Sequence, residues 1–150
     1  MINSRRHKVV LCLTASVVVL AAAGIASSRP TAPPPALSAA AADQLRAQVL
    51  NIAAANGEPS PKNGRYVQVS RRLASQLTSG GDIPDDGSAV LVVLEGHFTS
   101  SGPRPYGQAA ATGSVMTITV DRSTLEPRDL TISNTLPDLT QLGTLTALGN

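Results

Sequence analysis

The stretch AVLVVLEGHFT, residues 89–99, contains the most apolar run of the sequence beyond residue 26. Its length and its β-branched residues favour a strand over a helix. Because residues 90–94 are apolar without alternation, we expect a central strand of a sheet that is covered on both faces. The alternative is that residues 90–94 form an exposed edge onto which a partner's strand docks.

Two further strands follow and complete a predicted antiparallel meander. Residues 114–120 alternate apolar side chains with threonine, which predicts a strand that is buried on one face. Residues 121–127 form the turn, and residues 128–133 return as a third strand with Leu130 and Ile132 on one face. The connection at residues 100–113 is rich in Gly, Pro and Ala, as exposed loops are.

Two helices are predicted ahead of this meander. In residues 43–56, Asp43 is placed to cap a helix, and four apolar residues recur at helical spacing: Leu45, Val49, Ile52 and Ala53. Residues 64–79 carry a second apolar stripe: Tyr66, Val69, Leu73 and Leu77. The sequence therefore predicts an α+β fold, with one or two N-terminal helices packed on a small antiparallel three-stranded meander.

A tail rich in Leu and Thr follows the meander. Its leucines recur every third residue: Leu136, Leu139, Leu142, Leu145 and Leu148. This spacing drifts around an α-helix, so it forms no single apolar stripe. We expect residues 43–150 to be one small α+β domain whose tail is loosely ordered and lies over the rest.

Residues 1–26 have the pattern of a signal peptide. Arg5, Arg6 and Lys8 precede an uncharged apolar run, residues 9–26, that ends in small residues of the kind found at cleavage sites. The alternative is an uncleaved N-terminal anchor, since this run reaches the lower limit of bilayer-spanning length. Residues 27–42 are rich in Pro and Ala, which predicts a stiff spacer. We expect a secreted or cell-surface protein, membrane-anchored if the run is retained.

Charge and aromatic content exclude some ligands. The chain has 12 basic and 10 acidic residues, but three of the basic ones belong to the signal, and the remainder carries a net charge of −1. Such a domain has no electrostatic surface for nucleic acid. The aromatic residues Tyr66, Phe98 and Tyr106 are too few for a platform that stacks sugars or bases. Membrane contact is expected only through residues 9–26, if they are uncleaved.

The sequence predicts no cofactor and no metal site, and no residue is assigned a catalytic role. One acid–base set can be drawn: His97, the only histidine beyond the signal, with Glu95 or Asp121, two carboxylates that could pair across neighbouring strands. A single histidine and a single cysteine, Cys12 in the signal, exclude a zinc site.

An acidic loop precedes the apolar strand and is a candidate calcium site. It contains four oxygen-bearing side chains: Asp82, Asp85, Asp86 and Ser88. No bidentate glutamate follows at the spacing of a calcium loop, so a polar turn is the favoured interpretation.

Three segments resemble those of small exported proteins of high-GC bacteria: VLVVLEGHFT (90–99), TITVDRST (117–124) and PDLTQLG (137–143). This resemblance implies no activity and supplies no functional residues. The order of helix, strands and a Val-Asp-x-x-Thr turn is also similar to the PepSY domain. That resemblance implies an extracytoplasmic inhibitory or ligand-binding module, although Leu125 stands where that family has Gly after the turn threonine.

Two functions are therefore open. The first is an exported, non-enzymatic envelope or secreted module that binds a protein or peptide. The second is a small extracytoplasmic hydrolase that uses His97 with Glu95 or Asp121. The first is preferred because no nucleophile or acid–base pair is identifiable from the sequence.

The N-terminal pattern makes a testable prediction about export. We expect the mature protein in the culture medium or in the membrane fraction, starting near residue 27 if the signal is cleaved and at residue 1 if it is an anchor. Mass spectrometry of both fractions measures this directly. Recovery of the full-length chain as a soluble cytoplasmic protein would contradict the prediction.

Overall fold

The computed structural model describes residues 35–140 and 142–149. The predicted signal or anchor at residues 1–26 and the first half of the predicted spacer, residues 27–34, lie outside these ranges. Within the described residues, none of the helices combines the length and apolar character needed to span a bilayer.

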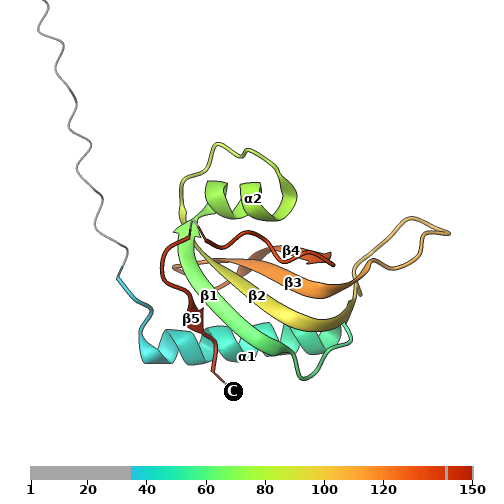
Figure 1. The fold of residues 1–150 in the computed structure, drawn as a ribbon, viewed down its shortest axis with the longest axis horizontal. Helices are drawn as coiled ribbons and strands as arrows, with labels where there is room; N and C mark the ends of the chain where they lie inside the picture. The colour runs from blue at the N-terminus through green and yellow to red at the C-terminus, as the bar shows by residue number, and fades with distance from the viewer. Residues whose placement is uncertain (1–34, 141, 150) are drawn as a thin grey trace, which may run out of the picture. The chain divides into compact units, whose positions relative to one another are not determined.

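The fold is α+β, as predicted, but the sheet has five strands rather than three. The elements follow in the order α1 (Ala39–Ala55), β1 (Lys62–Ser70), α2 (Arg71–Ser79), β2 (Ser88–Thr99), β3 (Thr112–Asp121), β4 (Pro127–Ser133) and β5 (Thr146–Ala147). The strand order is β4-β3-β2-β1-β5, and every neighbouring pair is antiparallel. The predicted meander is therefore present as β2-β3-β4, extended by β1 and by the short β5 on its other side (Figure 1).

The prediction of one helix over residues 64–79 was wrong, because this segment contains β1 and then α2. In β1, Val67 and Val69 lie on one face of the sheet, while Tyr66 packs into the core on the other face. The three-residue spacing from Tyr66 to Val69 resembles a helical stripe, but in a strand it points to opposite faces. The switch occurs at Ser70, whose hydroxyl accepts a hydrogen bond from the Leu73 N–H and caps α2.

Strand β2 is the centre of the structure, and both of its faces are buried as predicted. Residues 90–94 alternate between two apolar cores on opposite sides of the sheet. The α1 core contains Leu45, Val49, Ala53, Val90, Val92, Leu94, Phe98, Met116, Ile118, Val120, Leu125 and Leu148. The α2 core contains Val67, Ala74, Leu91, Val93, Val115, Leu139 and Leu142. Figure 1 shows α1 and α2 on opposite sides of the sheet.

Strand β3 is also buried on both faces, which corrects the prediction of a half-buried strand. Thr117 and Thr119 are only 5% and 4% exposed. They lie on the face of Val115, so they are covered from the α2 side. A threonine counts as polar in a sequence pattern, although its methyl group can pack in a core like an apolar side chain. For this reason the pattern predicted an exposed face for β3.

Helix α1 begins four residues earlier than expected. Ser38, not Asp43, is the N-cap, and its hydroxyl accepts a hydrogen bond from the Ala41 N–H at 3.2 Å. The helix buries one stripe, formed by Leu45, Val49 and Ala53, as the spacing predicted. Its C-terminal Asn56 is tied to the end of β2, because its carbonyl accepts from the Thr99 N–H at 2.8 Å.

The tail crosses from one face of the sheet to the other. Leu139 and Leu142 belong to the α2 core, whereas Leu148 belongs to the α1 core. Between them, β5 pairs with Arg65 and Tyr66 at the outer edge of β1. The three-residue leucine spacing thus serves two cores, with Leu136 left 43% exposed.

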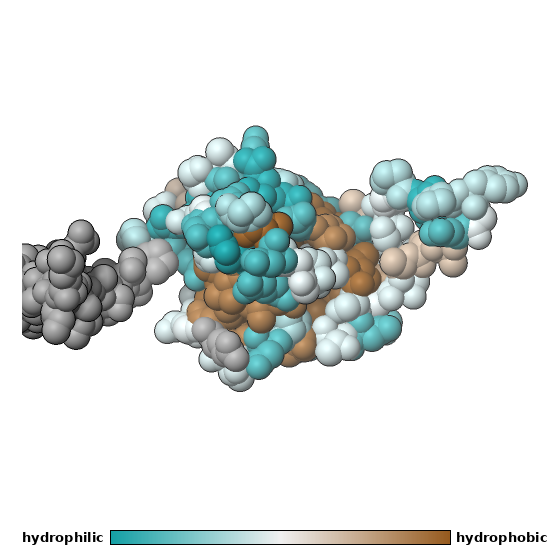
Figure 2. Space-filling model, turned by 90° about the horizontal axis from the view of Figure 1, so that it is seen from above, coloured by the Kyte–Doolittle hydropathy of each residue, from teal (hydrophilic) through white to brown (hydrophobic). Residues whose placement is uncertain are grey.

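The connection at residues 100–111 projects as an arm from the end of the β2-β3 hairpin (Figure 1). Figure 2 looks onto the α2 side and shows this arm standing clear of the body, while apolar surface remains visible between the polar side chains near α2. The aromatic ring of Tyr106, on the arm, is fully exposed. The arm contributes no residue to either core.

The double-sided burial of β2 makes a prediction about stability. Val92 is 0% exposed, so Val92→Asp would bury an unpaired carboxylate at a cost of several kcal/mol, against a typical total of about 5–15 kcal/mol. We expect this variant not to fold, as measured by circular dichroism. The control Ala109→Asp lies in the exposed arm and should leave the melting temperature unchanged. A folded Val92→Asp protein would contradict the core position of β2.

Candidate functional site

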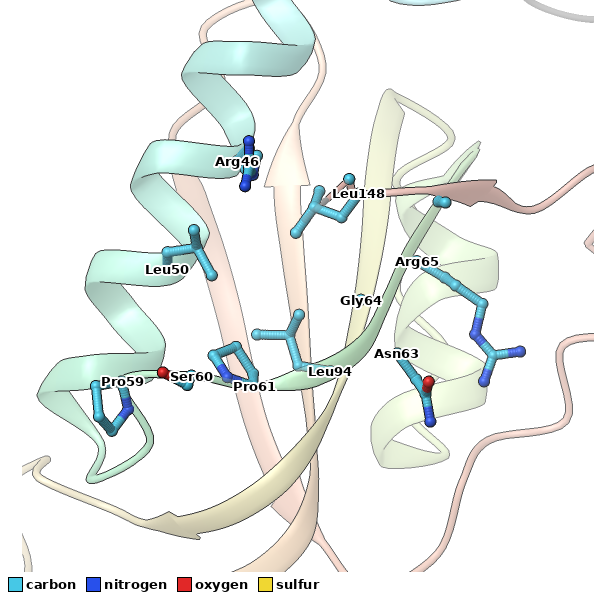
Figure 3. A pocket seen from close by; sticks show the side chains of 12 residues that line it. Arg46, Leu50, Pro59, Ser60, Pro61, Asn63, Gly64, Arg65, Leu94 and Leu148 are labelled. Atoms are coloured by element: carbon cyan, nitrogen blue, oxygen red, sulfur yellow. The ribbon is translucent and has the colours of Figure 1, made fainter.

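The main hollow of the described structure lies between α1 and the outer edge of the sheet at β1 and β5 (Figure 3). Its volume is about 820 Å³, within the range of ligand-binding pockets. It is lined by Arg46 and Leu50 of α1, by Leu94 of β2, and by residues from three further segments: Pro59, Ser60, Pro61, Asn63, Gly64, Arg65, Ala147, Leu148 and Gly149. We call this hollow the α1–β1 groove.

One end of the groove is built by the turn after α1. Gly57 leaves the helix with a positive φ of 89°, and Pro59 and Pro61 keep the following backbone extended. The Glu58 carboxylate holds this turn against β2, accepting hydrogen bonds from the Ser60 N–H at 3.2 Å and the His97 N–H at 2.9 Å. These bonds lower the pKa of Glu58, the one from His97 having the larger effect.

At Gly64, β1 lines the groove with backbone, and this lets Leu148 and Leu94 pack closely against the strand. Gly64 occupies the position on β1 that faces α1, and a Cβ there would lie 3.2 Å from both Leu148 and Leu94. The backbone is irregular at this point, with a bulge between Lys62 and Arg65 and a φ of 50° at Asn63. The Leu148 N–H donates to the Gly64 carbonyl at 2.8 Å, which brings the tail to the groove.

The lining of the groove is mixed, and its apolar part includes three leucines. Leu94 lies beneath the groove, and Leu50 of α1 and Leu148, directly after β5, face it (Figure 3). Leu94 is fully buried and Leu148 is 8% exposed, so both positions are fixed by packing in the α1 core. Leu50 is only partly buried, so it is the leucine whose apolar surface a ligand would remove from water.

Two arginines line the groove, and they differ in their partners. Arg65 points away from α1 and forms an ion pair with Glu95 at 3.0 Å, while Glu95 also accepts from the Asn63 amide at 3.0 Å. Arg46 lies on α1 at the end of the groove that Leu148 closes (Figure 3). Its Nε is buried without a hydrogen-bond partner, and it forms no ion pair with any described carboxylate.

The residues of the acid–base hypothesis are only partly brought together. His97 and Glu95 line a second, shallower hollow of about 500 Å³ beside the groove. Asp121 is not there: it pairs with Ala89, whereas Glu95 pairs with Val115, six residues along β3 and roughly 20 Å away at the rise of a strand. Glu95 and Asp121, which the sequence allowed to pair across neighbouring strands, therefore do not meet.

Asp121 has a local structural role. Its carboxylate accepts hydrogen bonds from the Ser123 hydroxyl at 2.7 Å and from the N–H groups of Ser123 and Thr124, which shapes the β3–β4 turn. These bonds, the Ser123 hydroxyl first, hold the pKa of Asp121 at about 2, below its ordinary value of 3.8.

The acidic loop before β2 is neutralised by the start of α2. Arg71 pairs with Asp85, and Arg72 pairs with Asp86 at 2.9 Å and with Asp82 at 3.7 Å. The loop thus docks on α2 through these two arginines. Over the described residues there is no group of three or more His, Cys, Asp or Glu side chains that could hold a metal ion.

Comparison of the chain with protein-family models, with curated proteins and with solved structures gives no match.

The sequence analysis did not single out Arg46, Gly64 or Leu148 as site residues. Arg46 is the one basic residue of α1 and follows the buried Leu45 directly, which places it at the margin of the apolar stripe. The position of Arg46 beside the apolar stripe could therefore have been recognised from the sequence. Gly64 was interpreted as a helical residue, and the pairing of Leu148 with β1 spans more than 80 residues, so neither had a local signal.

The depressed pKa of Asp121 predicts how stability depends on pH. Because the pKa is lower in the folded state, this carboxylate stabilises the fold above its unfolded pKa of about 4, and that contribution is lost as the pH falls through about 2. We expect Asp121→Asn to lower the melting temperature at neutral pH and to reduce its decline between about pH 4 and about pH 2. Thermal unfolding followed across this range tests the prediction. An unchanged profile in the variant would contradict the role of the carboxylate.

Proposed function

We propose that this chain is an exported, non-enzymatic module of the cell envelope or the secreted fraction that binds an apolar peptide segment of another protein in the α1–β1 groove. The observation that carries the proposal is the groove itself. It combines three lining leucines, an adjoining strand edge and a volume of about 820 Å³ in one place.

The edge of β1 supports a peptide as the ligand. Among the described residues, a strand pairs with this outer edge only at Arg65 and Tyr66, where the short β5 lies. Asn63, in the lining of the groove, and its neighbour Lys62 are exposed. An extended peptide can bond to such an edge through its backbone while its side chains occupy an adjacent apolar hollow. The tail already binds in this way, through Leu148 and Gly64.

The chemistry of the lining favours binding over catalysis. The described residues that line the groove include no His, Asp, Glu or Cys, so they offer no general acid or base beside Ser60. In the neighbouring hollow, both oxygens of Glu95 are engaged by Arg65 and Asn63 rather than by His97. A hydrolase built on His97 and Glu95 therefore has less support than a binding module.

The N-terminal pattern and the PepSY resemblance agree with this proposal. An n-region of Arg5, Arg6 and Lys8 followed by the apolar residues 9–26 is typical of export. The resemblance implies an extracytoplasmic ligand-binding or inhibitory module. The partner we expect is accordingly an envelope or secreted protein, and not a nucleic acid.

The proposal predicts that filling the groove abolishes peptide binding. The probes are fluorescein-labelled octapeptides with a free carboxylate that end in every pair of Val, Leu, Ile and Phe. Ser60 is exposed on the rim, so Ser60→Trp should block the groove without disturbing either core. We expect binding to the unmodified protein in fluorescence anisotropy, and at least about a tenfold loss in Ser60→Trp, or about 1.4 kcal/mol.

The matched control for this experiment is Ala54→Trp. Ala54 is exposed on α1 and does not line the groove, so the added ring should leave binding unchanged. The melting temperatures of both variants should equal that of the unmodified protein. The proposal fails if none of the peptides binds, or if Ser60→Trp and Ala54→Trp bind them equally well.

A further inference from the structure

We propose that Arg46 binds the terminal carboxylate of the peptide in the α1–β1 groove, so that the groove recognises an apolar C-terminus rather than an internal segment. This inference rests on the proposed peptide-binding function and specifies its ligand. It starts from the charge of Arg46, which the described structure leaves without a counterion.

The other arginines of the described helices, strands and turns have acceptors. Arg65 pairs with Glu95, Arg128 pairs with Asp121 and Glu126, and Arg71 and Arg72 bind the acidic loop. Arg122 donates to the Pro35 carbonyl at 2.7 Å. The buried Nε of Arg46 is unpartnered, as are those of Arg65, Arg71 and Arg122, but those three bond through their other nitrogens. Arg46 has no hydrogen-bond acceptor among the described residues for any of its nitrogens.

A half-buried guanidinium beside apolar side chains favours an anionic ligand. Its five N–H donors form a planar fork that matches a carboxylate, and such charge-assisted pairs are stronger than neutral hydrogen bonds. Arg46 is itself only half-exposed, and Leu50 and Leu148 lie beside it in the lining, which strengthens a charged hydrogen bond relative to one in bulk water. A ligand with an apolar body and one carboxylate matches both the lining leucines and the Arg46 guanidinium.

The position of Arg46 indicates that the carboxylate is at the end of the ligand. In Figure 3, Pro59 and Pro61 lie at one end of the groove, and Arg46 and Leu148 lie at the other. Leu148 lies near Arg46 at that end, and Gly149 also lines the groove. A peptide that enters over the prolines and crosses Leu94 reaches Arg46 and Leu148 at the far end. An acidic side chain within a longer segment would require the backbone to continue through Leu148.

The test compares free-acid and amidated forms of the same octapeptides. With the unmodified protein, the free acid should bind about 10- to 100-fold more tightly than the amide, as expected for a hydrogen-bonded charge. In Arg46→Gln the two forms should bind with equal affinity, close to that of the amide on the unmodified protein. Arg46→Lys should restore part of the preference, because it keeps the charge but not the fork.

A matched control removes a different positive charge. Arg104 lies in the exposed arm, and Arg104→Gln changes the net charge equally while leaving the groove intact. It should retain the full preference for the free acid. If Arg104→Gln reduces the preference as much as Arg46→Gln does, the effect is one of net charge and the assignment of Arg46 is wrong.

The outcomes separate this inference from the proposed function. Suppose that acid and amide bind the unmodified protein equally and Ser60→Trp still abolishes binding. The groove then binds peptides, as proposed, but Arg46 does not recognise their terminal carboxylate. If no peptide binds, both fall. Dodecanoate is tested beside the peptides, with dodecanol as its uncharged control. Arg46-dependent binding of dodecanoate without any peptide binding would identify an acyl carboxylate as the ligand and overturn the peptide assignment.

Discussion

A strand that is apolar on both faces cannot be stable at the surface of a protein, and the rest of this structure follows from that constraint. Burying residues 90–94 of β2 requires a cover on each side of the sheet. Helix α1 provides one cover, and α2 together with the leucines of the tail provides the other. The neighbouring β1 and β3 satisfy the backbone hydrogen bonds of β2, which are costly to leave unpaired in an apolar core.

The groove arises where the cover on one side is incomplete. The α1 core is filled by side chains of β2 and β3, with Ile132 of β4 packed against it. On β1 the corresponding face offers Tyr66 and then Gly64, so α1 and the outer edge of the sheet are separated beside Gly64. Leu148 closes one end of this gap but does not fill it. The site thus lies where backbone of β1, and not a side chain, faces α1.

The sequence predicted the elements whose signal is local. The uninterrupted apolar run identified β2, and the apolar spacing identified the stripe Leu45, Val49 and Ala53 of α1. The sequence-based prediction failed over residues 64–79. There the spacing from Tyr66 to Val69 is compatible with a helix as well as with a strand. Only the pairing of this segment with β2 shows that it is a strand. The site was out of reach for the same reason. Arg46, Leu94 and Leu148 meet through contacts between segments that are distant in the sequence.

The path of the tail determines when this domain can fold. Synthesis proceeds from the amino end, yet the α2 core lacks Leu139 and Leu142, and the α1 core lacks Leu148, until the last strand has been made. The pairing of Arg65 with Ala147 closes a loop of about 80 residues, a non-local contact of the kind that slows folding. A chain cut before residue 139 therefore lacks part of the cover of Leu91 and Val93 on the α2 face and Leu148 on the other. A truncation that removes residues 139–148 weakens both cores at once, although it removes only one short strand of the sheet.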